Sequence, residues 1–298
     1  NFSNKELIAI ALKFHASGDT KTASEYYQYY LEKGNLDPIV ITNYGVILKN
    51  NKRINESIKL FKKSISFFPE SLEAYVNLAN VLRDLGQLEE AELTARKCIQ
   101  INKEYYKAYL TLSNILRDFG RLKEAASCVR VSIRLKPDFV LGYLNLSIIL
   151  RDLGEFEEAL SLILKGIELD PNNSTLYFTH SLILKDLFQF EKAVKIMQRS
   201  LALDPNNTEI HFNLGLILKE TGNLKESEIS IRNAIKLDPN SSTFHTTLGC
   251  LLREIGKSQE AEAIHRKAIS LNPSDAYSHL NLGTVLLDNF DLDNAESS

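Results

Sequence analysis

The chain has 298 residues, 24% of them charged, with a formal net charge of −3, so no global basic field attracts nucleic acid or an anionic membrane. Hydrophobic residues make up 44%, but charges interrupt them every few positions, and no run reaches the ~18 apolar residues of a membrane span. We therefore expect a soluble protein without a nucleic-acid or membrane partner. The three cysteines lack a C-x-x-C spacing, which indicates buried thiols in a reducing compartment and predicts a cytoplasmic location.

An interval of 34 residues organises the whole chain. It is set by a column of carboxamides and hydroxyls at Asn43, Asn77, Thr111, Asn145, Thr179, Asn213, Thr247 and Asn281. A helical pattern with a fixed period of this length is the signature of a repeat array, in which each unit buries its apolar face against its neighbours. We predict a single array over residues 1–298, with repeats at 4–37, 38–71, 72–105, 106–139, 140–173, 174–207, 208–241, 242–275 and a partial one at 276–298.

Each repeat is predicted to contain two amphipathic helices joined by a short turn. Position 15 of the repeat carries Gly18, Gly86, Gly120, Gly154, Gly222 and Gly256. Glycine ends a helix there because it adopts the left-handed conformation at low cost. The second helix is expected to stop before position 32, which carries Pro69, Pro137, Pro171, Pro205, Pro239 and Pro273. The turns Asp170–Asn173, Asp204–Asn207 and Asp238–Ser241 supply side chains that can cap the next helix.

The packing positions support the same arrangement. Small residues recur at position 8, for example Gly45 and Gly249, and at position 20, for example Ser57 and Ala261. They let the two helices of a repeat approach closely. Leucine occupies position 11 from Leu48 onward, which predicts a continuous apolar core. The fold class is therefore an all-α solenoid.

The pattern resembles the tetratricopeptide repeat family over essentially all of the chain. The repeat that begins at Val140 matches the family pattern best, with Tyr143, Leu146, Ser147, Leu150, Ala159 and Pro171. The resemblance implies a right-handed superhelix of stacked helix-turn-helix units whose first helices line a concave groove. It also implies a protein or peptide partner.

The amide column, at position 6, is a candidate peptide-binding ladder. An asparagine side chain offers one acceptor and two donor hydrogens, the complement of a peptide group. The candidate binding residues are Asn43, Asn77, Asn80, Thr111, Asn114, Asn145, Thr179, Asn213, Thr247 and Asn281, with Asn80 and Asn114 forming a second column at position 9. The alternative is that these side chains cap or bridge neighbouring helices, and both hypotheses remain open at this point.

Two stripes of opposite charge are expected beside the ladder. Position 12 is basic and position 13 is acidic, with Arg83, Asp84, Arg117, Asp118, Arg151, Asp152, Lys185 and Asp186 as the clearest members. They predict either ion pairs between repeats, worth about 0–1 kcal/mol each when exposed, or contacts to a ligand.

Other chemistries find little support in the sequence. His211, His245 and His279 lie one repeat apart, in a column filled by tyrosine in earlier repeats. Successive helices are about 8–10 Å apart, too far for these residues to share a zinc ion with bonds near 2.0–2.1 Å, so packing is favoured. There is no Gly-rich phosphate loop, H-E-x-x-H motif or nucleophile elbow. We expect no catalytic residue, metal or cofactor in this segment.

Three functional hypotheses follow. The first is a scaffold that binds an extended peptide or partner segment in the groove. The second is the substrate-recognition region of a larger enzyme, because the ladder also resembles the repeat region of the O-linked N-acetylglucosamine transferases. Asn43, Asn77, Asn145, Asn213 and Asn281 match that family's ladder, Thr111, Thr179 and Thr247 depart from it, and a catalytic domain would lie outside this sequence. The third is a self-assembling array, a homo-oligomer.

Overall fold

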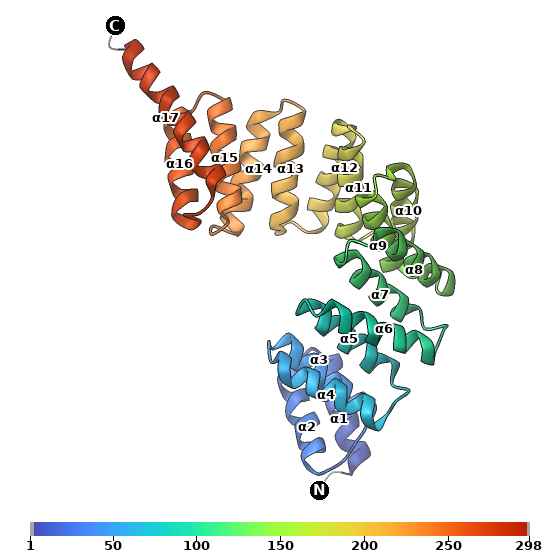
Figure 1. Ribbon diagram of the computed structural model, residues 1–298. Coiled ribbons are helices and arrows are strands. Elements are labelled where there is room, and N and C mark those ends of the chain that lie inside the picture. Colours follow the sequence, from blue (N-terminus) through green and yellow to red (C-terminus); the bar gives the residue numbers. More distant parts are fainter. Residues whose placement is uncertain (1–2, 297–298) are drawn as a thin grey trace. The chain divides into compact units, whose positions relative to one another are not determined.

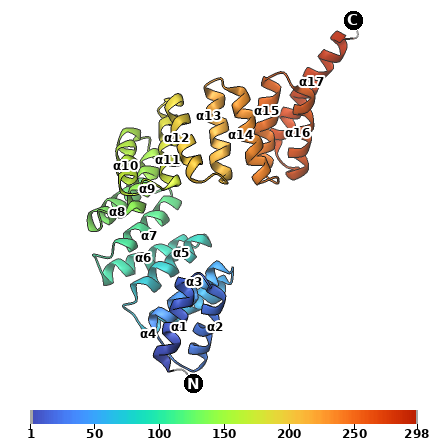
Figure 2. The same cartoon turned by 180° about the vertical axis from the view of Figure 1, so that it is seen from behind.

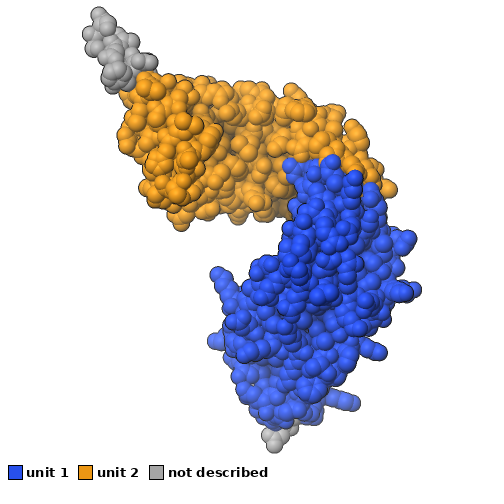
Figure 3. Space-filling model, viewed as in Figure 1, with its two compact units in different colours: residues 1–153 blue, residues 154–298 orange. Residues whose placement is uncertain are grey.

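The computed structural model describes the backbone of residues 3–296 and the side chains of residues 3–289. These residues form α-helices and no strands, in two compact units, residues 1–153 and residues 154–298 (Figure 3). Unit 1 contains α1 (Asn4–Ala16), α2 (Thr20–Glu32), α3 (Pro38–Asn50), α4 (Ile54–Phe67), α5 (Leu72–Asp84), α6 (Leu88–Ile101), α7 (Tyr106–Asp118), α8 (Leu122–Leu135) and α9 (Val140–Asp152). Unit 2 contains α10 (Phe156–Leu169), α11 (Ser174–Asp186), α12 (Phe190–Leu203), α13 (Thr208–Glu220), α14 (Leu224–Leu237), α15 (Ser242–Glu254), α16 (Ser258–Leu271) and α17 (Ala276–Glu296).

Within each unit, consecutive helices pack side by side as a stack of helical hairpins, which makes the chain an all-α solenoid (Figures 1 and 2). Every predicted repeat begins at the first residue of an odd-numbered helix, so the first helices follow the 34-residue interval. The position-15 glycines have φ between 75° and 84°, as their role in ending the first helix requires. Lys52 and Phe188 stand at the same position in their repeats and also have positive φ, 61° and 59°.

The last helix departs from the predicted pattern. A turn was expected near residue 290, which is position 15 of the partial repeat, but α17 continues from Ala276 to Glu296 without a break. Residue 290 is phenylalanine rather than glycine. Position 15 is not glycine in the second and sixth repeats either, where Lys52 and Phe188 have positive φ and the first helix ends, so the missing glycine alone does not account for the continuous helix. The second helix of the partial repeat is absent from the described backbone.

The predicted caps are present in unit 2. The side chains of Asn173, Asn207 and Ser241 accept hydrogen bonds from backbone N–H groups in the first turns of α11, α13 and α15. They satisfy donors that a helix leaves unpaired at its N-terminus. In these three repeats the turn that follows the position-32 proline therefore also starts the next helix.

The small residues at positions 8 and 20 bring the two helices of a repeat into contact. The Ser57 hydroxyl donates to the Gly45 carbonyl oxygen at 2.8 Å in unit 1, and the Ser227 hydroxyl donates to that of Gly215 at 2.7 Å in unit 2. A larger side chain at position 8 would collide with position 24 of the second helix. A Cβ on Gly45 would lie 2.6 Å from the Phe61 ring.

Position 24 contributes to the core in every repeat, but its chemistry changes along the chain. Phe61 and His265 occupy this position in α4 and α16, and both are fully buried. The Phe61 ring packs against Gly45, and the His265 ring packs against Gly249 in the same way. Neither ring nitrogen of His265 has a hydrogen-bond partner among the described residues, so a polar ring stands where most repeats place an apolar side chain.

Candidate functional site

The two charged stripes form ion pairs between successive repeats. In unit 1 the pairs are Lys49–Asp84 at 2.8 Å, Arg83–Asp118 at 3.5 Å and Arg117–Asp152 at 3.0 Å. In unit 2 they are Lys219–Glu254 at 2.8 Å and Arg253–Asp288 at 2.5 Å. Each joins position 12 of one repeat to position 13 of the next, so the structural interpretation accounts for these residues.

Other interactions and partial burial also restrict the charged side chains of the two stripes. Burial raises the pKa of Asp84, but hydrogen bonds from Lys49 and Arg83 outweigh it, so the pKa lies below its ordinary value. Arg151 and Asp186 take part in interactions as well. Lys185 is half-buried and lines a cavity of unit 2 beside Phe188.

In unit 1 the ladder amides differ in how they are bonded. Asn145 donates to the Asn114 side-chain oxygen at 2.9 Å, which joins two candidate binding residues to each other. Asn43 donates to the Tyr27 hydroxyl at 3.4 Å. Asn77 and Asn80, three residues apart on α5, are half-buried and make no hydrogen bond with any described residue. Their amides have unused hydrogen-bonding groups.

In unit 2 the corresponding side chains bond to their own helices. Asn213 donates to the Glu209 carbonyl oxygen at 2.9 Å, Asn281 donates to that of Tyr277 at 2.8 Å, and Thr247 donates to that of Thr243 at 2.9 Å. Each bond spans four residues, as is common for a polar side chain inside a helix. These amides keep an acceptor oxygen but have one donor hydrogen engaged.

The threonines of the ladder vary in exposure. Thr111 in α7 and Thr179 in α11 are only 4% and 3% exposed. Thr247 is half-buried. A contact between a ligand and the first two would require the ligand to reach into the helix packing, so they offer little binding surface.

Two histidines of the column contact the turns between repeats, whereas His245 contacts the Ser241 carbonyl oxygen four residues before it. His211 and His279 contact the carbonyl oxygens of Pro205 and Pro273 through Nε2, at 3.0 Å and 2.9 Å. Tyr143 uses its hydroxyl in the same way, donating to the Pro137 carbonyl oxygen at 2.9 Å. Histidine therefore replaces tyrosine as a side chain that holds the preceding proline turn. Among residues 3–289 there is no group of three or more His, Cys, Asp or Glu placed to hold a metal ion.

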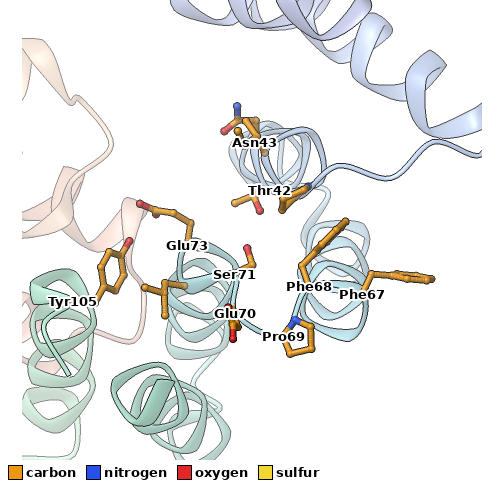
Figure 4. Close-up of a pocket in the computed structure, with 12 residues that line it drawn as sticks. Thr42, Asn43, Phe67, Phe68, Pro69, Glu70, Ser71, Glu73 and Tyr105 are labelled. Atoms are coloured by element: carbon orange, nitrogen blue, oxygen red, sulfur yellow. The ribbon is translucent and has the colours of Figure 1, made fainter. Parts of the chain in front are cut away.

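A cavity of about 870 Å³ opens in unit 1 beside the first turns of α3 and α5 (Figure 4). We call it the α3–α5 cavity. Figure 4 shows Phe67 and Phe68 on one side of it, and Glu73 and Tyr105 on the other. Its lining consists of Pro38, Ile39, Thr42, Asn43, Phe67, Phe68, Pro69, Glu70, Ser71, Leu72, Glu73 and Tyr105. The ladder residue Asn43 is thus part of a largely apolar cavity.

The sequence carries one signal for this cavity, at a repeat position outside the predicted site residues. Position 31 is polar in six repeats, where Asn102, Lys136, Asp170, Asp204, Asp238 and Asn272 stand. In the second repeat this position is Phe68, and it follows another aromatic residue, Phe67. Phe67 is 56% exposed. Phe68 is thus an aromatic side chain at a position that is polar in those repeats, and together with the exposed Phe67 it marks a surface different from the other repeats.

A second cavity, of about 450 Å³, lies in unit 2 and is lined by charged groups. Its lining includes Lys219, Arg253, Glu254 and Asn281. Positions 6, 12 and 13 therefore share one face of the first helices, which we call the ladder face. In unit 2 the cations of this cavity are already engaged by the ion pairs described above.

The hairpin stack defines a class of helical-repeat proteins, and comparisons of sequence identify the family. Tetratricopeptide repeat models match residues 40–71, 72–105, 106–139, 142–173 and 174–207, and a second model of the same repeat matches 196–228 and 231–263. These matches cover more than half of the chain. The chain belongs to the tetratricopeptide repeat family, whose members generally mediate protein–protein interactions. No curated protein matches the sequence.

Solved structures share the fold at low sequence identity. A chain in the crystal structure of the APC/C hetero-tetramer Cut9–Hcn1 matches 89% of this chain with a TM-score of 0.70 and 16% identity. The match covers 52% of that chain, so this chain spans about half its length. A tetratricopeptide repeat protein from Parabacteroides merdae matches 84% of this chain and 98% of its own, with a TM-score of 0.64 and 11% identity.

A shorter match is MamA from Desulfovibrio magneticus RS-1, which covers 57% of this chain and 97% of its own, with a TM-score of 0.52 and 21% identity. At such identities the likeness concerns the fold alone. In the part of the chain that the structure describes, no helix is long and apolar enough to cross a lipid bilayer.

Proposed function

We propose that the chain is a scaffold that binds an extended segment of a partner protein, and that unit 1 carries the main binding surface on its ladder face. One observation supports this location above all. Asn77 and Asn80 are half-buried, lie on one side of α5 and have no hydrogen-bond partner among the described residues. Their amide atoms remain open to water and can exchange it for the hydrogen-bonding groups of a ligand main chain.

The spacing of the ladder fits an extended ligand. Neighbouring helices pack about 8–10 Å apart, and an extended chain advances about 3.3–3.6 Å per residue. A ligand strand that crosses the stack would meet one ladder residue at roughly every third peptide unit. Such a surface holds a main chain and selects few side chains, so sequence selectivity must come from neighbouring cavities.

The test uses peptides selected from a random linear library on the intact chain. The affinity of the selected peptides is then measured by fluorescence anisotropy. We expect Asn77→Ala combined with Asn80→Ala to weaken binding by roughly tenfold, because two amide hydrogen bonds are each worth about 0.5–1.5 kcal/mol. Thermal stability should change little, since neither amide bonds to the protein.

The matched control is Asn213→Ala in unit 2, where the amide bonds to its own helix. It should leave peptide affinity within about twofold of the parent chain. Failure to select any peptide, or an affinity unaffected by the double substitution, would contradict the proposal. A large fall in melting temperature of the double variant would assign these amides to structure instead.

The other two hypotheses have no observation of the structure in their favour. A glycosyltransferase would need a catalytic domain outside these residues, and none of the relatives named above is described as one. A self-assembling array would need a surface that pairs with another copy. Light scattering of the purified chain tests that alternative directly.

A further inference from the structure

The α3–α5 cavity contains a buried hydroxyl without a partner. Thr42 is 6% exposed and lines the cavity from α3. Its Oγ1 atom makes no hydrogen bond within the described chain. A buried polar group in this condition costs about 1–3 kcal/mol. The hydroxyl lies in the cavity wall and is an unpaired hydrogen-bonding group beside the space that a ligand would fill.

A threonine at the same position in another repeat has hydrogen-bond partners for its hydroxyl. Thr246 in α15 also stands at position 5 and is 3% exposed. Its hydroxyl bonds to the Ser242 carbonyl oxygen at 3.0 Å and to the Ser278 hydroxyl at 2.6 Å. The residue equivalent to Ser278 in the third repeat is Ala74, which offers no hydroxyl. Thr42 therefore lacks the inter-repeat partner that Thr246 has.

The charged residues that line the cavity are all acidic. Only two of its lining residues are charged, and both are glutamates, Glu70 and Glu73. Glu73 is paired with Lys107 at 2.6 Å. Glu70 is exposed and forms no ion pair among the described residues. Burial, with the nearby Glu73 carboxylate, raises the pKa of Tyr105, so this phenol stays neutral. The rim therefore favours a cation.

The walls are suited to a large apolar side chain. Ile39 and Phe67 are 55% and 56% exposed, so both leave apolar surface uncovered. A volume of about 870 Å³ lies within the ~300–1,000 Å³ of typical ligand sites. Aromatic residues gain most from such a site, because each buries about 150–250 Å². The ladder residue Asn43 opens into the same space, which links the cavity to the proposed path of the ligand main chain.

We propose that the α3–α5 cavity is the selectivity site for the bound segment, and that it takes an aromatic or large aliphatic side chain flanked by lysine or arginine. The apolar side chain lies between Ile39 and Phe67, a ligand main-chain group hydrogen-bonds to the Thr42 hydroxyl, and the basic residue faces Glu70. The partner is a protein segment with this basic–apolar chemistry. The inference rests on the proposed function and adds the chemistry of the ligand.

The experiment begins with the same selection from a random linear peptide library on the intact chain. Sequencing of the enriched peptides should show an aromatic or large aliphatic residue next to lysine or arginine. A selected peptide is then compared with copies in which the apolar residue is alanine or the basic residue is glutamate. Each change should weaken binding at least fivefold, and the effect of the charge change should shrink in high salt.

Two substitutions in the protein test the cavity itself. Thr42→Val keeps the shape and removes the unpartnered hydroxyl, so we expect about fivefold weaker binding with equal or higher thermal stability. Thr246→Val is its matched control, because it removes a hydroxyl that is bonded within unit 2; it should lower stability and leave affinity unchanged. Ile39→Lys places a cation in the cavity wall and should weaken binding more than tenfold. Ile229→Lys, at an isoleucine 61% exposed, is the control for that change.

The outcomes separate this inference from the proposed function. Peptides that lose affinity on the Asn77 and Asn80 substitutions but show no basic–apolar pattern, or bind Thr42→Val and Ile39→Lys normally, would overturn the selectivity site and leave the scaffold standing. The absence of any selected peptide would count against both. Binding sensitive to both sets of variants supports both.

Discussion

The two units present the same repeat positions with different polar chemistry. In unit 1, Phe61 fills the core opposite Gly45, and the amides of Asn77 and Asn80 have no partner on the protein. In unit 2, His265 takes the core place opposite Gly249, and Asn213 bonds to its own helix. Both units contain buried polar atoms without partners, such as the Thr42 hydroxyl in unit 1 and the His265 ring in unit 2. They differ on the ladder face, where unit 1 has two amides without a partner and the Asn213 amide of unit 2 is engaged by its own helix.

This contrast indicates how a repeat array divides its roles. A side chain that lacks hydrogen-bond partners in the core reduces stability, whereas one that lacks them on a binding face can be satisfied by a ligand. The backbone pattern is the same in both units, so the division depends on a few side chains. Substitutions at those side chains can therefore test it.

The largest effect is expected from Phe61→Ala in unit 1. The ring is fully buried between α3 and α4, and its removal leaves a cavity that the close helix packing cannot fill. We expect a loss of about 3–5 kcal/mol in the free energy of unfolding, measured by urea denaturation followed by circular dichroism. Tyr29→Ala, at an exposed aromatic of α2, is the control and should cost less than about 1 kcal/mol. Equal losses would mean that the column is not the core of unit 1.

The next largest effect is a gain in the free energy of unfolding, expected from His265→Phe in unit 2. This change gives unit 2 the side chain that unit 1 places in the equivalent site, and it removes two buried ring nitrogens without partners. We expect about 1–3 kcal/mol of added stability, read from the urea midpoint. A loss of stability would show that the space opposite Gly249 fits only the smaller imidazole ring.

The same histidine should make unit 2 sensitive to acid. Burial lowers the pKa of His265, and also that of His180, below the ordinary histidine value near 6.5. The unfolded chain therefore binds these protons more readily than the folded one. Their contribution is fully present above about pH 6.5 and is lost as the pH falls through the lowered values. Melting temperatures measured from neutral to mildly acidic pH should fall less steeply for His265→Phe than for the parent chain, and parallel curves would refute this.

A smaller gain is expected from Phe188→Gly in unit 2. Phe188 is 80% exposed and has φ of 59° at a position that is glycine in six repeats. A left-handed conformation costs a bulky residue roughly 1–2 kcal/mol, partly offset by the flexibility of glycine in the unfolded chain. We expect a net gain of about 1 kcal/mol in the free energy of unfolding. The reciprocal control, Gly222→Ala at φ of 75°, should lose a similar amount.

The smallest effect is expected at the charged stripes. A double-mutant cycle on Lys49 and Asp84 in unit 1 should give a coupling energy of about 0–1 kcal/mol that shrinks in high salt. The Lys219–Glu254 pair of unit 2 should give a similar value, because its side chains are comparably exposed. A much larger coupling energy in only one unit would show that these ion pairs contribute differently to the stability of the two units.

The sequence predicted the helix boundaries well because they depend on local chemistry. Glycine at position 15 and proline at position 32 act within a few residues of themselves. The exception is α17, which continues past position 15 without a break. The inter-repeat ion pairs followed from the same period, since position 12 of one repeat meets position 13 of the next.

The candidate site was less predictable, because its properties depend on atoms from different repeats. Thr42 and Thr246 occupy the same position in the repeat, and only the neighbouring repeat decides whether the hydroxyl finds Ser278 or faces an alanine. Asn77 and Asn145 are alike in sequence, yet one is unpaired and the other bonds to Asn114.

The sequence by itself thus determined the period, the helices and the family, which are set by local conformational preferences repeated along the chain. Only the tertiary structure decided which ladder amides are free, where the apolar cavity opens and which core side chains lack partners. The physical reason is that hydrogen bonding and burial are properties of pairs of residues, and most of the deciding pairs here join helices from successive repeats.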